Sequence, residues 1–286
     1  MARLTLDQLV QYVQEIPALP DVAMKVLRMT EDPLVSAREV AAAVAVDVAL
    51  TSRILKIANS AYYGMSRRIS TVNEAVLLLG MRSLRSLALA AAAYDTLKQE
   101  VRGYSLPAGE LWRHSVACAL TSQVVAHRSR AAAAEEAFVA GLLHDVGKVV
   151  LNTYVGDQFQ AILALVELEG IPFHEGEKVI LGFEHAEVGA RIAEKWNLPG
   201  HLCGAIAGHH DVALGGEKPA LAAVVHVANC ICVTEGLGTT GDGLPPTFDE
   251  CALSLLKLDE ADVEALTAEA VTMVAAASNP LEAARA

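Results

Sequence analysis

The sequence predicts an all-α protein, and three observations support this prediction. Alanine and leucine recur at three- and four-residue spacing along the chain, which is the period of a helix with a buried face. Aromatic residues make up only 5% of the sequence, and the alternating β-branched residues typical of strands are scarce. The capping-box spacing that begins helices occurs at Thr5/Gln8, Ser36/Glu39 and Thr71/Glu74.

The first region is expected to contain five or six short helices that end near residue 93. Helices are predicted to stop at residues that cannot continue them, namely Pro17, Pro20, Asp32 followed by Pro33, Gly64 and Gly80. A looser stretch, 101–109, contains Gly103 and Pro107 and separates this region from the next.

The rest of the chain is predicted to form longer helices and one loop. The helices are expected at 111–127, 135–143, 158–168, 184–196, 201–209, 220–234 and 260–276. Residues 236–246 are rich in Gly, Thr and Pro, as in a surface loop. We therefore expect three parts: residues 1–104, 105–240, and 241–286, the last a loop and an acidic helix that pack on the second part.

Charge and histidine are unevenly distributed over these parts. The chain carries a net charge of −12, yet residues 1–104 carry +2, and all nine histidines lie beyond residue 104. The overall charge argues against a protein that coats nucleic acid or anionic membrane. The absence of a signal-peptide pattern and of a run of 18 apolar residues predicts no membrane span. Five cysteines without a C-x-x-C pair predict neither a disulfide framework nor a zinc ribbon, so we expect a cytoplasmic protein.

Histidines and one aspartate form the main candidate site. His144 and Asp145 directly follow the apolar run 137–143, where an imidazole and a carboxylate are costly to bury unless a partner satisfies them. A metal ion is such a partner. Further candidate ligands lie in or at the ends of predicted helices: His114, His185, His209, His210, and the His226/Asn229 segment. Such donors suit Fe, Mn or Zn, and two ions about 3.5–4 Å apart are typical of phosphoester hydrolysis. The remaining histidines, His127, His174 and His201, are interpreted as ordinary core or surface residues.

The histidine and aspartate pattern resembles the HD superfamily of metal-dependent phosphohydrolases, and its dinuclear branch that includes the HD-GYP cyclic di-GMP phosphodiesterases. The resemblance implies that Asp145 bridges two ions and that Lys148 faces substrate phosphate. It also implies that His185, His209 and His210 hold one ion, and that His114 and His144 hold the other. The family's final aspartate falls on Asn229, whose neutral amide is a weaker ligand, and no Gly-Tyr-Pro segment follows His210.

Longer motifs resemble a specific family. Residues 16–20 (IPALP), 47–55 (DVALTSRIL), 58–64 (ANSAYYG) and 75–80 (AVLLLG), together with 196–199 (WNLP) and His209–His210, are similar to the HDOD signature. The resemblance implies an N-terminal helical subdomain packed on an HD-like helical subdomain, in a bacterial signalling protein. No receiver, GGDEF or EAL module is present, so signalling partners would act in trans.

A basic segment in the first region leaves two interpretations open. Residues 53–85 contain six basic residues and one acidic residue, and 36–60 can be interpreted as a helix-turn-helix that binds phosphates or DNA. Arg53, Asn59, Arg67 and Arg68 are then candidate ligand-binding residues. We favour the alternative, in which the basic residues form a solvated or ion-paired face and Asn59 is a buried cap.

These observations predict a regulatory protein with an incomplete HD-type metal site, catalytic residues Asp145 and Lys148 if the site is active, and one or two bound ions. Its partner is expected to be a signalling protein or a nucleotide second messenger. The alternative is a metal-dependent phosphohydrolase that acts on a cyclic dinucleotide or a nucleotide. A DNA-binding regulator is a third hypothesis, and the sequence does not indicate an oligomeric state.

Overall fold

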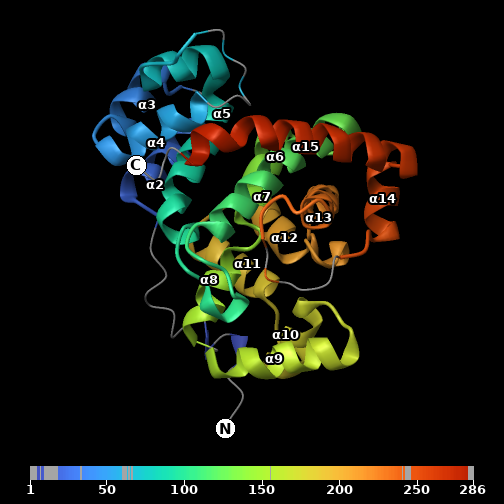
Figure 1. Ribbon diagram of the computed structural model, residues 1–286. Helices are drawn as coiled ribbons and strands as arrows, with labels where there is room; N and C mark the ends of the chain where they lie inside the picture. Colours follow the sequence, from blue (N-terminus) through green and yellow to red (C-terminus); the bar gives the residue numbers. More distant parts are fainter. Residues whose placement is uncertain are drawn as a thin grey trace. The chain divides into compact units, whose positions relative to one another are not determined.

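The computed structural model describes residues 5–6, 8–9, 19–32, 34–59, 63, 65, 67–154, 156–239, 241 and 246–282. These residues form α-helices and short 3-10 helices, and the described ranges contain no strand, only an isolated bridge between Val101 and Leu106 (Figure 1). The all-α prediction is confirmed. Residues 16–18, most of 60–64 and most of 240–245, which carry parts of the signature motifs and of the expected loop, lie outside the described residues.

The helices follow one another with short connections. They are α2 (Asp21–Glu31), α3 (Ala37–Val44), α4 (Val48–Ala58), α5 (Val72–Leu97), η2 (Arg102–Tyr104), α6 (Glu110–Ser129), α7 (Ala134–Leu143), α8 (Val146–Tyr154), α9 (Gly156–Glu169), α10 (Phe173–Leu181), α11 (His185–Lys195), α12 (Gly200–Ala207), η3 (Val212–Leu214), α13 (Pro219–Thr234), α14 (Glu250–Leu256) and α15 (Glu260–Glu282). Three of the α-helices, α8, α10 and α14, are absent from the sequence prediction.

The chain divides into two compact units. Unit 1 comprises Met1–Pro17 and Asp95–Ala270, and unit 2 comprises Ala18–Tyr94 and Val271–Ala286. Each unit is described by itself.

Unit 2 contains the predicted helix starts at Ser36 and Thr71, whereas the predicted stops at Pro17, Pro33 and Gly64 lie outside the described residues. The Ser36/Glu39 capping box forms in both directions, and Thr71 accepts a hydrogen bond from the Glu74 amide at 3.1 Å. Gly80 interrupts α5 with φ 85° and ψ 167°, a conformation that residues with a Cβ rarely adopt. The predicted stop at Gly80 is therefore a break between two helical segments.

One helix, α5, is long and apolar enough to cross a membrane by length and composition. However, 56% of its most apolar stretch is buried inside the protein. Its buried residues include Leu84, Leu87 and Leu89, none more than 1% exposed. This burial is typical of a core helix rather than of a span that faces lipid.

Unit 1 is built around two helices that are buried on nearly all sides, α6 and α13. Helix α6 packs against α7 and α13, α11 packs against α8 and α12, and α9 lies beside α10, as the lower part of Figure 1 shows. Because α6 and α13 carry small and apolar residues around their circumference, neighbours can pack on every face. The histidines of the candidate site therefore lie inside the core of unit 1.

Candidate metal centre

Asp145 is the centre of the site. It stands in the turn between the end of α7 and the start of α8, and its side chain is 1% exposed. Oδ2 of Asp145 accepts a hydrogen bond from Lys148 Nζ at 2.9 Å. The Lys148 side chain is fully buried, and its ammonium lies 5.3 Å from the centre of the Tyr104 ring. A buried carboxylate and a buried ammonium thus compensate each other.

His114 and His144 lie on the Oδ2 side of Asp145. Nε2 of His144 is 3.4 Å and Nε2 of His114 is 3.8 Å from Oδ2. His144 Nδ1 donates to the Gly141 carbonyl at 2.8 Å, which directs Nε2 towards the cluster. Asn229 of α13 meets this side as well, because its Oδ1 lies 3.1 Å from His114 Nε2.

His185 lies on the opposite, Oδ1 side of Asp145. It is the first residue of α11, and its Nε2 is 3.2 Å from Oδ1. Its Nδ1 donates to Glu177 Oε2 at 2.7 Å, and its backbone amide donates to the same oxygen at 3.0 Å. The Tyr104 hydroxyl donates to the other Glu177 oxygen. This chain of contacts fixes which His185 nitrogen carries the proton.

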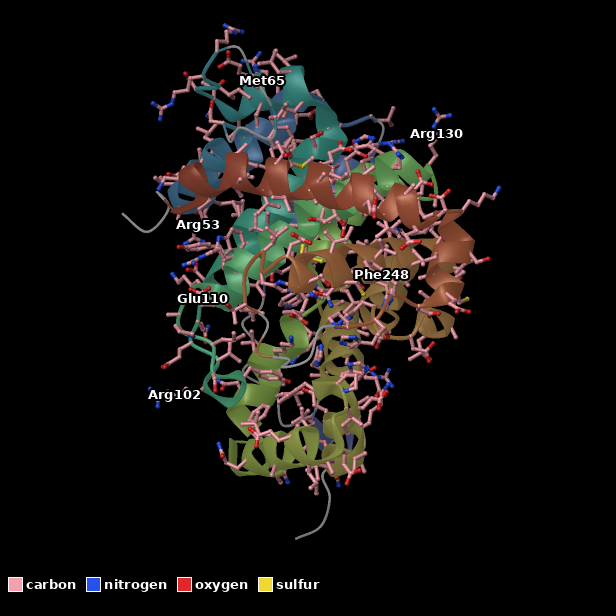
Figure 2. All side chains as sticks on the ribbon, turned by 45° about the vertical axis from the view of Figure 1, so that its right-hand side comes forward. Arg53, Met65, Arg102, Glu110, Arg130 and Phe248 are labelled. Atoms are coloured by element: carbon pink, nitrogen blue, oxygen red, sulfur yellow. The ribbon has the colours of Figure 1, made fainter. Side chains whose placement is uncertain are left out.

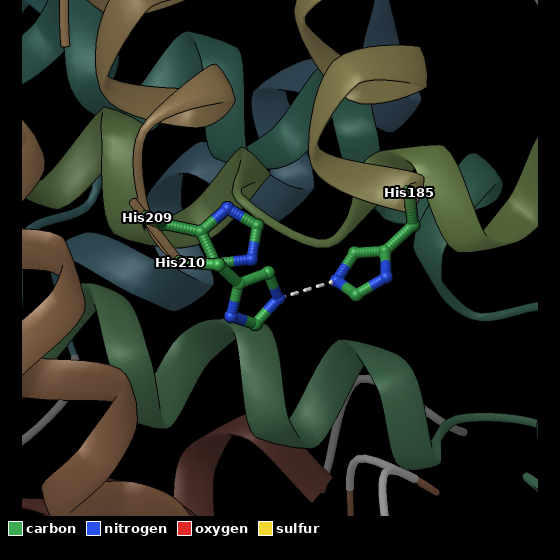
Figure 3. Close-up of side chains that lie close together, drawn as sticks. All are labelled: His185, His209 and His210. Atoms are coloured by element: carbon green, nitrogen blue, oxygen red, sulfur yellow. Dashed lines mark hydrogen bonds between the residues drawn. The ribbon is translucent and has the colours of Figure 1, made fainter. Parts of the chain in front are cut away.

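His209 and His210 follow the end of α12 and complete the Oδ1 side. His209 Nδ1 donates to the Ile206 carbonyl at 2.7 Å, and its Nε2 lies 3.9 Å from Asp145 Oδ1. Nε2 of His210 lies 3.0 Å from Nε2 of His185, the pair joined by the dashed line in Figure 3. All the candidate ligands that the sequence predicts are therefore brought together.

His226 is not a substitute ligand for Asn229. Its Nδ1 donates to the His209 carbonyl at 2.9 Å, and its Nε2 accepts from the Asp249 amide at 3.0 Å. Both ring nitrogens are thus used to join α13, the His209 segment and the start of α14. His226 has a structural role beside the cluster.

Glycine allows the helices of the cluster to approach closely. A Cβ on Gly147 of α8 would lie 2.7 Å from the Gly189 amide nitrogen and closer still to the His185 carbonyl oxygen. Helices α8 and α11 can therefore cross with their backbones in contact only while residue 147 lacks a side chain. This crossing places His185 beside Asp145.

The pKa values of the cluster follow from burial and from its few charges. Burial alone would raise the pKa of Asp145, but the neighbouring His144, Lys148 and His185 favour the carboxylate and hold that pKa well below its usual range. Burial lowers the pKa of His144, and it lowers the pKa of His209 and His210 further. For His185 the attraction of Glu177 outweighs burial and raises the pKa to about 10.

The donor set fits a divalent metal ion. Three groups of ligand atoms each lie within 4.8 Å of one another: His185, His209 and His210; His114, His144 and Asp145; and His174, Glu184 and His210. Within the described part of the chain, the buried atoms of these groups that make no hydrogen bond include His144 Nε2, His209 Nε2 and Asp145 Oδ1. Unsatisfied buried nitrogen and oxygen atoms directed at one place are costly without a cation. Imidazole with carboxylate is the donor set of Fe, Mn or Zn.

The candidate ligand-binding residues of unit 2 have protein partners. Arg53, labelled in Figure 2, donates to the Ala91 carbonyl at 3.3 Å and lies 4.8 Å from the centre of the Tyr94 ring. The Asn59 amide group donates to the Leu55 and Ile69 carbonyls and accepts from the Ile69 amide. These contacts favour the interpretation of Asn59 as a cap, at the end of α4, although its side chain is only partly buried. Arg67 is exposed and pairs with Glu74 at 3.0 Å, and Arg68 is exposed.

Two residues of the site, Glu177 and Tyr104, are absent from the sequence prediction. Glu177 lies on the unpredicted helix α10, and Tyr104 on the short turn η2. Glu177 is fully buried and Tyr104 is 2% exposed. The available sequence signal was a glutamate in an apolar stretch eight residues before a candidate ligand, which is too common a pattern to single out.

Comparisons with known proteins agree with this geometry. The all-helical unit and its buried histidine–aspartate cluster define a helical protein with a set of metal-type donors in its core. The HDOD domain profile matches residues 16–212, and the chain belongs to the HDOD domain family.

Two crystal structures match almost the whole chain. An HDOD domain protein of unknown function from Geobacter sulfurreducens is 30% identical, with a TM-score of 0.80 over 97% of this chain and 98% of that chain. A protein from Shewanella amazonensis, provisionally described as a phosphohydrolase, is 25% identical, with a TM-score of 0.73 over 96% and 97%. An uncharacterized protein from Treponema pallidum is 28% identical over 227 residues. This alignment covers 78% of the present chain and 44% of that relative, so the chain spans less than half of the relative's length.

Proposed function

We propose that this chain is a bacterial signal-transduction protein of the cytoplasm that binds Fe, Mn or Zn in its His–Asp cluster. In this proposal it acts by binding a signalling protein or a nucleotide second messenger rather than by turning over a substrate. The metal ion would hold together segments that carry His114, Asp145, His185 and His209–His210, which are far apart in the sequence. Metal binding of this kind stabilises one arrangement of the helices.

The burial of most of the cluster carries this proposal; His210 is the candidate ligand that is only partly buried. His114, His144, Lys148, His185 and His209 are each 0% exposed, and Asp145 is 1% exposed. A phosphoester must reach the ions on which it is hydrolysed, whereas an ion that only joins helices need not contact solvent. The neutral Asn229 at the position of a family carboxylate supports the same conclusion, because it provides no charge for a metal ion.

The proposal is tested by metal content and hydrolysis together. We expect the purified protein to retain Fe, Mn or Zn in elemental analysis, and His144→Ala to retain less. We expect no hydrolysis of cyclic di-GMP or bis(p-nitrophenyl) phosphate with any of the three ions supplied. Hydrolysis that Asp145→Asn abolishes would overturn the regulatory proposal.

A second function, a metal-dependent phosphohydrolase of cyclic dinucleotides or nucleotides, is favoured by a different observation. Two of the donor groups lie on opposite oxygens of one carboxylate, Asp145, which is the arrangement of a bridged pair of ions. Bound ions would polarise the phosphate and supply a nucleophile at neutral pH. This function needs the buried cluster to open, so activity should appear only with an added partner or ligand, and it should be lost in Asp145→Asn.

A further inference from the structure

The two oxygens of Asp145 have different surroundings. Oδ2 is engaged by Lys148 Nζ at 2.9 Å. Oδ1 makes no hydrogen bond to any described residue, although His185 Nε2 is 3.2 Å away. Oδ2 is therefore held by an ammonium, whereas Oδ1 faces imidazole nitrogens, which can release a proton and bind a metal ion instead.

The Oδ2 side is poorly suited to a second divalent ion. An ion there would share Oδ2 with the buried ammonium of Lys148, and like charges repel strongly where solvent is excluded. The remaining oxygen donor on this side is the neutral Asn229, whose Oδ1 already contacts His114 Nε2 at 3.1 Å. Among the described residues, Asp145 is the carboxylate that lies beside His114 and His144, and its charge is already compensated by Lys148.

The charges around the cluster permit one divalent ion. Asp145 and Glu177 carry two negative charges, and Lys148 carries one positive charge. The buried Glu184 is compensated by Lys178 at 3.1 Å. One divalent ion, bound with release of the second His185 proton, gives a net charge of +1, whereas two such ions give +3 in a largely buried place. Buried charge of that size is not tolerated without further carboxylates.

The Oδ1 side has the donors of a complete site. Figure 3 shows His185, His209 and His210 with their rings directed towards one another. Glu177 holds the Nδ1 proton of His185, and the Ile206 carbonyl holds that of His209, so both Nε2 atoms face the cluster; the His185 Nε2 lone pair becomes available when a metal ion displaces its proton. With Asp145 Oδ1 they form a set of three imidazoles and one carboxylate, which suits Zn, Mn or Fe.

We infer that the cluster binds a single divalent ion, held by Asp145 Oδ1, His185, His209 and His210. A bridging carboxylate would otherwise hold a second ion on the Oδ2 side. Lys148 takes the place of that ion and supplies its positive charge, and the neutral Asn229 stands where that ion would need a carboxylate. This inference rests on the metal-binding part of the proposed function and specifies its stoichiometry and its ligands.

The matched variants His209→Gln and His114→Gln test the inference, since both histidines are fully buried and lie on opposite sides of Asp145. Each protein is incubated with Zn²⁺, dialysed against metal-free buffer and analysed for zinc, and circular dichroism confirms that it is folded. We expect one ion per chain in the original protein, one in His114→Gln and fewer than 0.1 in His209→Gln, that is, roughly a tenfold or greater loss.

Other results separate the inference from the proposed function. No retained zinc, manganese or iron in the original protein would overturn metal binding itself, and with it the inference. Two ions per chain, or one ion that is lost in His114→Gln and kept in His209→Gln, would overturn only the inference.

A variant that is expected to gain a second metal site provides a further test of the inference. Asn229→Asp places a carboxylate beside His114 and His144, so we expect the zinc content to rise from one to two ions per chain. An unchanged content of one ion in a folded Asn229→Asp protein would show that Asn229 does not exclude the second ion, and would overturn that part of the inference.

Discussion

At the scale of single residues, Glu177 determines how His185 can act. It accepts the His185 Nδ1 proton at 2.7 Å and the His185 amide at 3.0 Å, while Tyr104 donates to its other oxygen. The carboxylate therefore keeps the His185 Nε2 lone pair directed at the cluster. Partners of metal-binding histidines of this kind typically contribute about 10–100-fold to metal affinity.

Glu177→Gln removes this charge with little change in shape. We expect the dissociation constant for Zn²⁺ to rise about 10–100-fold, measured by competition with a chromophoric chelator. Glu175→Gln is the matched control, because Glu175 lies exposed on the same helix α10. An equal change in both variants, or none in Glu177→Gln, would contradict a positioning role for Glu177.

At the scale of elements, the crossing of α8 and α11 depends on Gly147. Gly147→Ala places a methyl group 2.7 Å from the Gly189 nitrogen and closer to the His185 carbonyl, and backbone atoms cannot rotate away as side chains can. We expect a loss of about 1–3 kcal/mol in the free energy of unfolding from overpacking, although alanine favours helices. Urea denaturation measures this loss.

Gly200→Ala is the control for that experiment. A Cβ on Gly200, the first residue of α12, meets no atom within 4 Å. We expect the free energy of unfolding of this variant to be unchanged or slightly higher, since alanine has a helix propensity about 1 kcal/mol better than glycine. Similar losses in the two variants would mean that the crossing at Gly147 is not tightly constrained.

The helices also show how much of the fold could be predicted from the sequence. Long helices with a strong apolar period, such as α6 and α13, were predicted within a few residues, as was the break at Gly80. Helix α10 was missed because it is short and begins after Pro172 without a side-chain cap. The ligands His144 and Asp145 stood out because polar groups follow an apolar run.

Other features of the site depend on contacts between distant segments, which no local pattern records. Asn229 contacts His114, which is 115 residues away in the sequence, and Tyr104 contacts Glu177, which is 73 residues away. The sequence therefore predicted the donors but not their partners. Those partners decide which side of Asp145 has a free oxygen.

At the scale of the whole molecule, the proposed metal binding would be linked to the stability of unit 1. Its ligands come from the segment before α8, from α11 and from the segment after α12, so unfolding of the unit separates them. A ligand that binds only the folded state at 100 times its dissociation constant adds about 2.7 kcal/mol to the free energy of unfolding. For a unit of this size that corresponds to an increase of roughly 5–11 °C in melting temperature.

Calorimetry of the full chain, with Zn²⁺ and with chelator, measures this increase. We expect the higher melting temperature with Zn²⁺ to return to the lower value when chelator is added. His209→Gln should melt at the same temperature in both conditions, because the metal ion loses a ligand in that variant. An equal zinc-dependent increase in the melting temperature of His209→Gln would show that the stabilising ion binds elsewhere on the protein. If zinc does not increase the melting temperature of the original protein, the folded cluster does not hold the ion.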